Sequence, residues 1–197
     1  MLMCSVSGVR GIIGVDLTPE IAARYAAAYG TVLGGGRVVM AWDTRPTGGM
    51  ICAAALSGLL SAGCEVIAIG VAPTPTVPLA VSHFKAAGGL AITASHNPIE
   101  WNALKFIGSA RSVMPARTIS RIYETADRNR IVYRSWDRIG RHTHSDAMVD
   151  HHVAAVLRLP QVDRDAVRKR RPVVVYDAGG GAGARYAPTL LKRMGCR

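Results

Sequence analysis

The sequence lacks the features that mark a membrane or secreted protein. No apolar run approaches the roughly 18 residues that a membrane-spanning helix needs. The start, Met1–Cys4, does not show the basic and then apolar pattern of a secretory signal. We therefore expect no membrane partner and a cytoplasmic location. Because 49% of the residues are hydrophobic, the chain can bury a sizeable core, and a disordered chain is excluded.

Metal-binding patterns are also missing. The sequence has only four cysteines, none of them in a CxxC pair, and a cytoplasmic chain seldom keeps disulfides. We predict reduced, mostly buried thiols. A group of histidines lacks cysteine or fixed carboxylate partners, and we interpret it as a solvated polar segment rather than a metal site. These histidines are His142, His144, His151 and His152.

Aromatic residues are scarce at 6%, whereas basic residues are abundant in one half of the chain. Residues 1–110 carry six Lys/Arg and five Asp/Glu, but residues 111–197 carry eighteen and eight. A basic half can bind nucleic acid. Here no aromatic side chains interleave with the arginines in a stacking pattern, so we predict a solvated basic surface and keep nucleic-acid binding as the weaker alternative.

Helix and strand signals alternate through the first 110 residues. Thr18–Glu20 is typical of a helix start, with an N-cap, a proline and an acid in the first turn. The alternation predicts an α/β fold in which a mostly parallel mixed sheet is sandwiched by helices. The predicted strands are 37–42, 64–69 and 89–93, with an edge strand at 103–107, and the predicted helices are 18–29, 49–62 and a segment that ends near residue 85.

The rest of the chain predicts a second, incomplete α/β domain. Residues 114–130 form a polar helix that closes a first domain at 1–135, residues 136–145 are a linker, and 146–197 begin the second domain. That domain contains a helix at 147–157, a strand at 173–176, a glycine-rich turn without GxGxxG spacing, and a helix at 185–194. Since one strand and one helix cannot bury both faces of a sheet, we expect this domain to be truncated.

The most informative stretch is Thr93–Pro98, with the sequence TASHNP. It follows a predicted strand, and open α/β sheets place ligands at the carboxyl ends of their strands. A serine held there can act as a nucleophile or phosphate carrier. From the residues alone, an ordinary turn in which Ser95 and Asn97 bond to the local backbone is equally well supported.

Those six residues are similar, position for position, to the active-serine motif of the α-D-phosphohexomutases. This family includes phosphoglucosamine mutases, phosphomannomutases and phosphoglucomutases. Further segments resemble the family in the same order along the chain, although Trp42 stands in place of a usual arginine and Ala103 in place of a usual glycine. The matching segments are Ser7–Gly11 (SGVRG), Leu17–Glu20 (LTPE), Asp43–Pro46 (DTRP), Asn102–Phe106 (NALKF) and Val173–Gly195, which resembles the start of the family's second domain.

The resemblance implies a phosphotransferase that moves a phosphoryl group between the 1- and 6-positions of a hexose or hexosamine phosphate. Phosphorylated Ser95 would give its phosphoryl group to the sugar phosphate, and the resulting bisphosphate would turn over and return the other. The family expectation is an isomerase, most closely of the phosphoglucosamine mutase or phosphomannomutase type, and this chain alone is expected to be inactive.

The resemblance also assigns roles to the residues around Ser95. Arg10 would be a fixed cation near the phosphoserine, and Lys105 would assist proton transfer or neutralise phosphate. His96 would either hydrogen-bond to the reacting groups or be structural. Arg45 would either contact the site through its loop or form a buried ion pair with Asp43. Phosphate binding is expected from Arg10, Arg45, Ser7 and Asn97.

The expected cofactor is Mg²⁺, which the family holds through its phosphoserine and an Asp-Gly-Asp loop in its third domain. That loop is absent from this sequence, so Ser95, through its phosphate, is the only expected metal ligand. The expected partners are a sugar phosphate and either the missing C-terminal domains or a partner chain. The alternative function is a catalytically silent truncated or split-protein module that binds a partner chain.

Overall fold

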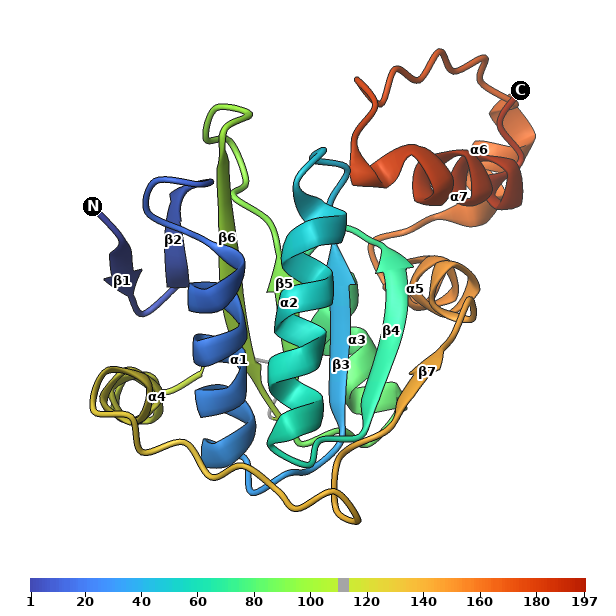
Figure 1. Cartoon of the computed structure of the whole chain (residues 1–197). Helices are drawn as coiled ribbons and strands as arrows, with labels where there is room; N and C mark the ends of the chain where they lie inside the picture. The colour runs from blue at the N-terminus through green and yellow to red at the C-terminus, as the bar shows by residue number, and fades with distance from the viewer. Residues whose placement is uncertain (110–113) are drawn as a thin grey trace. The chain divides into compact units, whose positions relative to one another are not determined.

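The computed structural model describes residues 1–109 and 114–197, which form two compact units (Figure 1). The first unit is Met1–Ser145 and the second is Asp146–Arg197. The first contains one mixed β-sheet with helices on both faces, and the second contains helices and an extended segment.

The sheet of the first unit has the strand order β1-β2-β6-β5-β3-β4-β7. Strands β5, β3, β4 and β7 run parallel to one another, whereas β6 is antiparallel to both of its neighbours, β5 and β2. The predicted mixed sheet is therefore confirmed. Its strands are β1 (Met3–Ser5), β2 (Gly8–Ile12), β3 (Val38–Trp42), β4 (Val66–Val71), β5 (Gly88–Ile92), β6 (Trp101–Gly108) and β7 (His142–His144).

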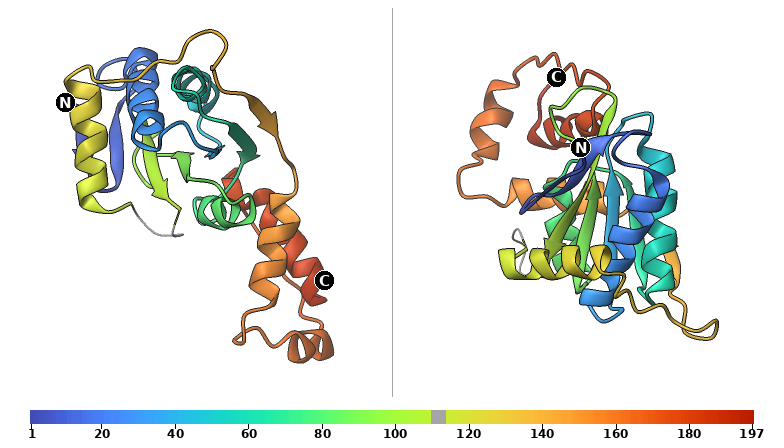
Figure 2. Two further views of the ribbon diagram at one scale, coloured as in Figure 1. Left: turned by 90° about the horizontal axis from the view of Figure 1, so that it is seen from below. Right: turned by 60° about the vertical axis from the view of Figure 1, so that its left-hand side comes forward.

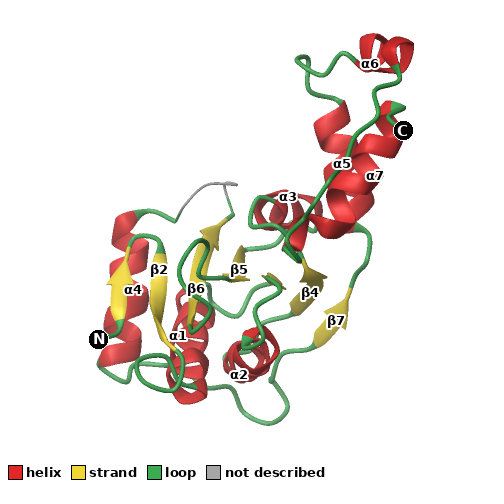
Figure 3. Ribbon diagram, turned by 90° about the horizontal axis from the view of Figure 1, so that it is seen from above, coloured by secondary structure: helices red, strands yellow, loops and turns green. Residues whose placement is uncertain are grey.

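Helices α1 and α2 cover one face of the sheet and α3 covers the other, while α4 packs beside α1 (Figures 2 and 3). The predicted start of α1 is confirmed, because the Thr18 hydroxyl accepts a hydrogen bond from the Ile21 amide at 3.3 Å. These four helices are α1 (Pro19–Val32), α2 (Gly48–Ser61), α3 (Thr76–His83) and α4 (Ala116–Asp127).

The main core lies between α1, α2 and the sheet, and its polar groups are satisfied. Tyr29 is fully buried, and its hydroxyl lies 3.1 Å from the carbonyl oxygen of Gly89 and 2.8 Å from that of Ile107. These contacts join α1 to two adjacent strands, since Gly89 is on β5 and Ile107 on β6. A buried phenol without such acceptors would be strongly destabilising, so this residue fixes the helix on the sheet.

Two segments of the first unit differ from the predictions. The strand predicted at the sheet edge, 103–107, is part of β6 and lies inside the sheet, because β2 pairs with its other side. The segment predicted as a linker, 136–145, contains β7, which pairs in parallel with β4. Strand β7 is short and exposed, so it carries no alternation of apolar and polar residues that sequence analysis could detect.

The second unit is built from three helices and one short 3₁₀ turn. They are α5 (Met148–Leu157), α6 (Arg164–Arg170), η1 (Ala182–Arg185) and α7 (Tyr186–Met194). The predicted strand at 173–176 is extended but is not part of a sheet in the described residues. In the described chain, its backbone hydrogen bonds are made with Arg197. The Val174 amide donates to the Arg197 carbonyl oxygen at 2.8 Å, and the Arg197 amide donates to the Pro172 carbonyl oxygen at 2.9 Å.

Candidate active site

Ser95 sits in a strained turn directly after β5. The turn is tied to β6, since the Thr93 amide donates to the Ala103 carbonyl at 3.0 Å. Ser95 has a φ of 57°, a left-handed conformation that non-glycine residues adopt rarely and at an energetic cost. Its amide donates to the Thr93 hydroxyl at 3.1 Å, and its side chain is exposed. The turn thus presents the serine hydroxyl to the surface.

Arg45 stabilises this turn through hydrogen bonds to its backbone. Its guanidinium donates to the carbonyl oxygens of Ser95 at 3.0 Å and Asn97 at 2.6 Å. It also donates to those of Pro98 at 2.6 Å and Trp101 at 3.1 Å. Because the planar guanidinium presents several donors in fixed directions, one side chain can fix the path of the whole loop.

The same guanidinium is anchored by Asp43. The Arg45 Nε lies 3.3 Å from the Asp43 carboxylate, and the two side chains are only 12% and 18% exposed. The structure shows both alternatives for Arg45, the largely buried ion pair with Asp43 and contact with the loop of the site. The donors are engaged with carbonyl oxygens and a carboxylate, and Arg45 does not line the cavity described below. Its contacts indicate a role in positioning the turn, and phosphate binding by Arg45 stays a prediction.

The two predicted cations approach the turn from β2 and β6. Arg10 on β2 is directly opposite Ala103 on β6, so their side chains share a face of the sheet. Lys105 lies two residues beyond Ala103 and therefore points to the same face. Ala103, at the position where the family resemblance expects glycine, lines the same cavity as the two cations. This register brings residues far apart in sequence next to Ser95.

A cavity of about 210 Å³ brings these groups together. Its wall includes the predicted nucleophile and every other predicted site residue except Arg45. A glycine is required at its rim, since a Cβ at Gly8, which has a φ of 118°, would lie 2.0 Å from the Leu104 carbonyl oxygen. The lining residues are Ser5, Ser7, Gly8, Arg10, Thr93, Ala94, Ser95, His96, Asn97, Ala103 and Lys105.

The cavity is electropositive and suited to an anion. Arg10 and Lys105 line it, and its described lining includes no carboxylate. The Arg10 Nε is buried and has no hydrogen-bond partner among the described residues, which leaves a donor free for a ligand. His96 Nδ1 lies 3.5 Å from the Ser95 hydroxyl oxygen, close enough to exchange a hydrogen bond after a small side-chain movement.

Asn102 supports the site, although the sequence analysis assigns it no role of its own. It is fully buried, its amide nitrogen donates to the Thr47 hydroxyl at 3.0 Å, and its Oδ1 accepts from the Ala103 amide at 2.8 Å. It therefore links β6 to the residue before α2. A polar residue inside an apolar strand is the sequence signal that could have revealed it.

Other candidate sites from the sequence do not gather into a centre. In residues 1–109 and 114–197, no group of three or more His, Cys, Asp or Glu side chains is placed to hold a metal ion. The four cysteines are free thiols, of which Cys52 and Cys64 are buried and Cys4 is exposed, so the prediction of mostly buried thiols holds for only part of them. No helix in the described chain has the length and apolarity to cross a membrane.

Together, the layered sheet and the cationic cavity define an α/β domain with a cation-lined cavity beside an exposed serine hydroxyl. The model of the family described as phosphoglucomutase/phosphomannomutase, alpha/beta/alpha domain I, matches residues 2–131. The chain belongs to this family.

Relatives and solved structures agree with this assignment. The chain is 40% identical to a phosphoglucomutase/phosphomannomutase of Thermococcus kodakarensis, over 96% of this chain and 42% of the relative. It is 38% identical to a probable phosphoglucosamine mutase of Methanopyrus kandleri, over 96% and 41%. A putative phosphomannomutase of Thermus thermophilus superposes with a TM-score of 0.83 at 30% identity, over all of this chain and 44% of that one. The chain thus spans about two fifths of the length of these relatives.

Proposed function

We propose that this chain supplies the phosphoryl-carrying serine of a phosphohexomutase, with Ser95 as the carrier. The observation that carries the proposal is the placement of the Ser95 hydroxyl, in a strained turn, in one cavity with Arg10 and Lys105. Two fixed cations beside a serine are the arrangement that phosphoryl transfer needs, because catalysis there depends on positioning and charge neutralisation.

The proposed phosphoryl transfer runs in both directions. The Ser95 oxygen attacks the phosphorus of a sugar bisphosphate, a P–O bond forms at Ser95, and the P–O bond to the sugar breaks. The serine proton passes to a neighbouring base, for which His96 and Lys105 are the candidates in the cavity wall. The sugar oxygen leaves on the opposite side of the phosphorus and takes up one proton to become a hydroxyl, which balances the proton that Ser95 releases. In the reverse direction, phosphorylated Ser95 transfers its group to a sugar monophosphate.

The proposed substrates are hexose or hexosamine phosphates, with the group moving between the 1- and 6-positions. The names of the relatives, phosphoglucomutase/phosphomannomutase and probable phosphoglucosamine mutase, support this class. Within it, we propose the phosphoglucosamine mutase or phosphomannomutase type. The cavity wall holds hydroxyl, amide and cationic groups next to the serine, which suits the phosphate end of such a substrate rather than its sugar ring.

The described residues do not form a complete Mg²⁺ site. This ion prefers octahedral oxygen ligands, commonly carboxylates together with phosphate, and no described carboxylate lines the cavity. A phosphate on Ser95 is therefore the only ligand that we propose from this chain. We further propose that mutase turnover needs further domains or a partner chain, because the chain spans only about two fifths of the relatives' length. Uptake of one phosphoryl group by Ser95, in contrast, needs only the residues of its cavity.

Intact-mass spectrometry of protein purified from cells tests the proposal. We expect a fraction that carries one added phosphate group and its disappearance in Ser95→Ala. Ser82→Ala is the matched control, since Ser82 lies on α3 and outside the cavity. If the added phosphate persists in Ser95→Ala, Ser95 is not the carrier. If the wild-type chain takes up no phosphate either in cells or from a hexose 1,6-bisphosphate, the chain is a catalytically silent module.

A further inference from the structure

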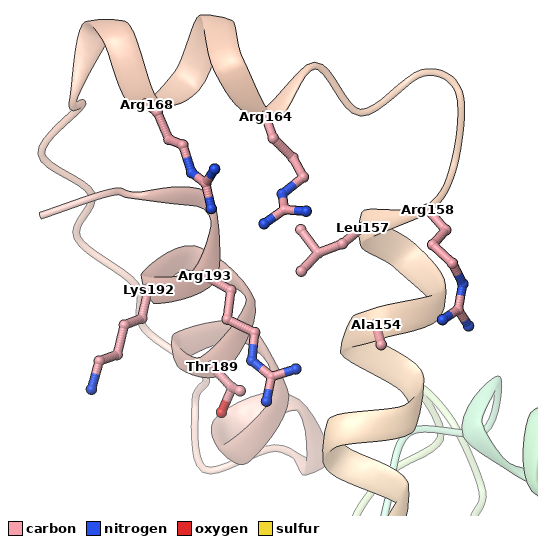
Figure 4. Close-up of a pocket in the computed structure, with 8 residues that line it drawn as sticks. All are labelled: Ala154, Leu157, Arg158, Arg164, Arg168, Thr189, Lys192 and Arg193. Atoms are coloured by element: carbon pink, nitrogen blue, oxygen red, sulfur yellow. The ribbon is translucent and has the colours of Figure 1, made fainter.

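The second unit contains a cavity that the proposed mutase chemistry does not use. It has a volume of about 820 Å³ and lies between α5, α6 and α7 (Figure 4). Among its lining residues, five are cationic and none is acidic or aromatic. The lining residues are Ala154, Leu157, Arg158, Arg164, Arg168, Thr189, Lys192 and Arg193.

Three of the cations point toward the space between the helices. Figure 4 shows Arg164 and Arg168 extending from α6 into this space and Arg193 extending into it from α7, whereas Arg158 and Lys192 point outward from its rim. Arg164 and Arg168 are four residues apart on one helix and therefore share a face.

The charges of these inward arginines are only partly neutralised by carboxylates of the protein. Arg193 is paired with the carboxylate of Asp150. In the part of the chain that the structure describes, no ion pair joins Arg164 or Arg168 to a carboxylate, and the buried Arg164 Nε has no hydrogen-bond partner. Like charges four residues apart destabilise a helix, and a buried donor without a partner costs further free energy. Both costs fall when an anion enters the cavity.

We propose that this cavity binds a small anion that carries two or more phosphate groups. Phosphate oxygens match the fixed donors of guanidinium groups and accept two hydrogen bonds from each. Arginines on two different helices line the cavity and can contact more than one phosphate group at once, which favours a di- or triphosphate over a single phosphate. Since no described lining residue is aromatic, the cavity offers no stacking surface for a nucleobase.

Isothermal titration calorimetry of the full chain with inorganic tripolyphosphate tests the proposal. The test variant is Arg164→Gln/Arg168→Gln, and the matched control is Lys169→Gln/Arg170→Gln, which removes the same charge from exposed side chains of α6 that do not line the cavity. We expect binding to the wild-type chain, at least about a tenfold weaker affinity in the test variant, and less than about a threefold change in the control. Circular dichroism establishes that both variants are folded.

Equal losses in the two variants would overturn the proposal, because they would show attraction to a basic surface in general. The absence of binding to the wild-type chain at about 50 mM salt would also overturn it. A nucleoside triphosphate that binds no better than tripolyphosphate supports recognition of the phosphates alone. A single-stranded oligonucleotide that binds more tightly than tripolyphosphate would replace the cavity with a nucleic-acid surface. Ser95→Ala is expected to bind tripolyphosphate normally, so this test is independent of the mutase proposal.

Discussion

The guanidinium of Arg45 donates a hydrogen bond of 3.0 Å to the carbonyl oxygen of Ser95, fifty positions away in the sequence. Three more carbonyl oxygens of the same loop accept from this side chain. The conformation of Ser95, with a φ of 57°, is unfavourable for a serine, and these bonds stabilise the loop that contains it. The turn that presents the proposed nucleophile therefore depends on a residue that does not line the cavity.

Arg45→Lys is expected to slow phosphorylation of Ser95 by about tenfold or more while the protein stays folded. Lysine keeps the charge but cannot supply a planar set of donors to four carbonyl groups. The measurement is the rate of phosphate uptake from a hexose 1,6-bisphosphate, followed by intact mass. Hydrogen exchange should show faster exchange at the amides of residues 94–97.

The matched control for this variant is Arg37→Lys. Arg37 also joins a carbonyl oxygen, that of Phe84, to a carboxylate, that of Glu65, but it does not line the Ser95 cavity. Its replacement should leave the phosphorylation rate within about twofold of the wild type. Equal slowing in both variants would show a general loss of stability rather than a role of Arg45 at the turn.

Arg10→Gln and Lys105→Gln are each expected to lower phosphate uptake by at least about tenfold, because each removes a cation that faces the transferred group. The exposed Arg117 on α4 provides the control, Arg117→Gln, for which we expect no change. The assay is uptake from a hexose 1,6-bisphosphate at fixed ionic strength. Unchanged rates in both cavity variants would show that the two cations do not contribute to the transfer.

Gly8→Ala is expected to destabilise the first unit by at least about 2 kcal/mol and to reduce phosphate uptake. Its Cβ would lie 2.0 Å from the Leu104 carbonyl oxygen, so β2 would have to move away from β6 and take Arg10 with it. Gly14→Ala is the control, since Gly14 also has a positive φ of 79° but has no atom within 4 Å of the added Cβ. It should cost about 1 kcal/mol. Equal losses in urea denaturation would contradict the steric argument.

The free energy of unfolding should fall as the pH rises from about 9 to about 11. Burial raises the pKa of the Cys64 thiol from 9.0 to about 11, and that of Cys52 likewise to about 11. In this window the unfolded chain loses these protons while the folded chain retains them, so unfolding becomes more favourable. Denaturant titrations across the window should show that the free energy of unfolding depends less on pH in Cys64→Ala than in the wild type. An unchanged pH dependence in Cys64→Ala would contradict the prediction.

The parts of the structure that the sequence predicted are those with local signals. The start of α1 could be predicted because the Thr18 hydroxyl caps the helix by accepting a hydrogen bond from the nearby Ile21 amide. The turn at Ser95 could be located because a strand pattern ends just before a short motif. The meeting of Arg10 with Lys105 was expected from the family resemblance alone, because it depends on the antiparallel pairing of β2 with β6. The residues themselves do not encode that register locally.

Two differences have the same physical origin. Strand β7 exists because its backbone completes the pairing of β4, whereas its exposed side chains contribute no pattern. Conversely, Val173–Tyr176 has the apolar composition of a strand but pairs only with Arg197 in the described chain. Strand formation depends on a partner as well as on composition. Arg45 shows the same limit at the site, since its carbonyl partners could not be identified from the sequence.

The most direct test of the central claim is to locate the phosphate after the purified chain is incubated with a hexose 1,6-bisphosphate. Peptide mapping by tandem mass spectrometry identifies the modified residue, and the Thermococcus kodakarensis relative serves as the positive control. We predict a single phosphoryl group on Ser95 in the wild-type chain and none in Ser95→Ala. Phosphate on another residue, or no phosphate on this chain while the relative is labelled, would contradict the account.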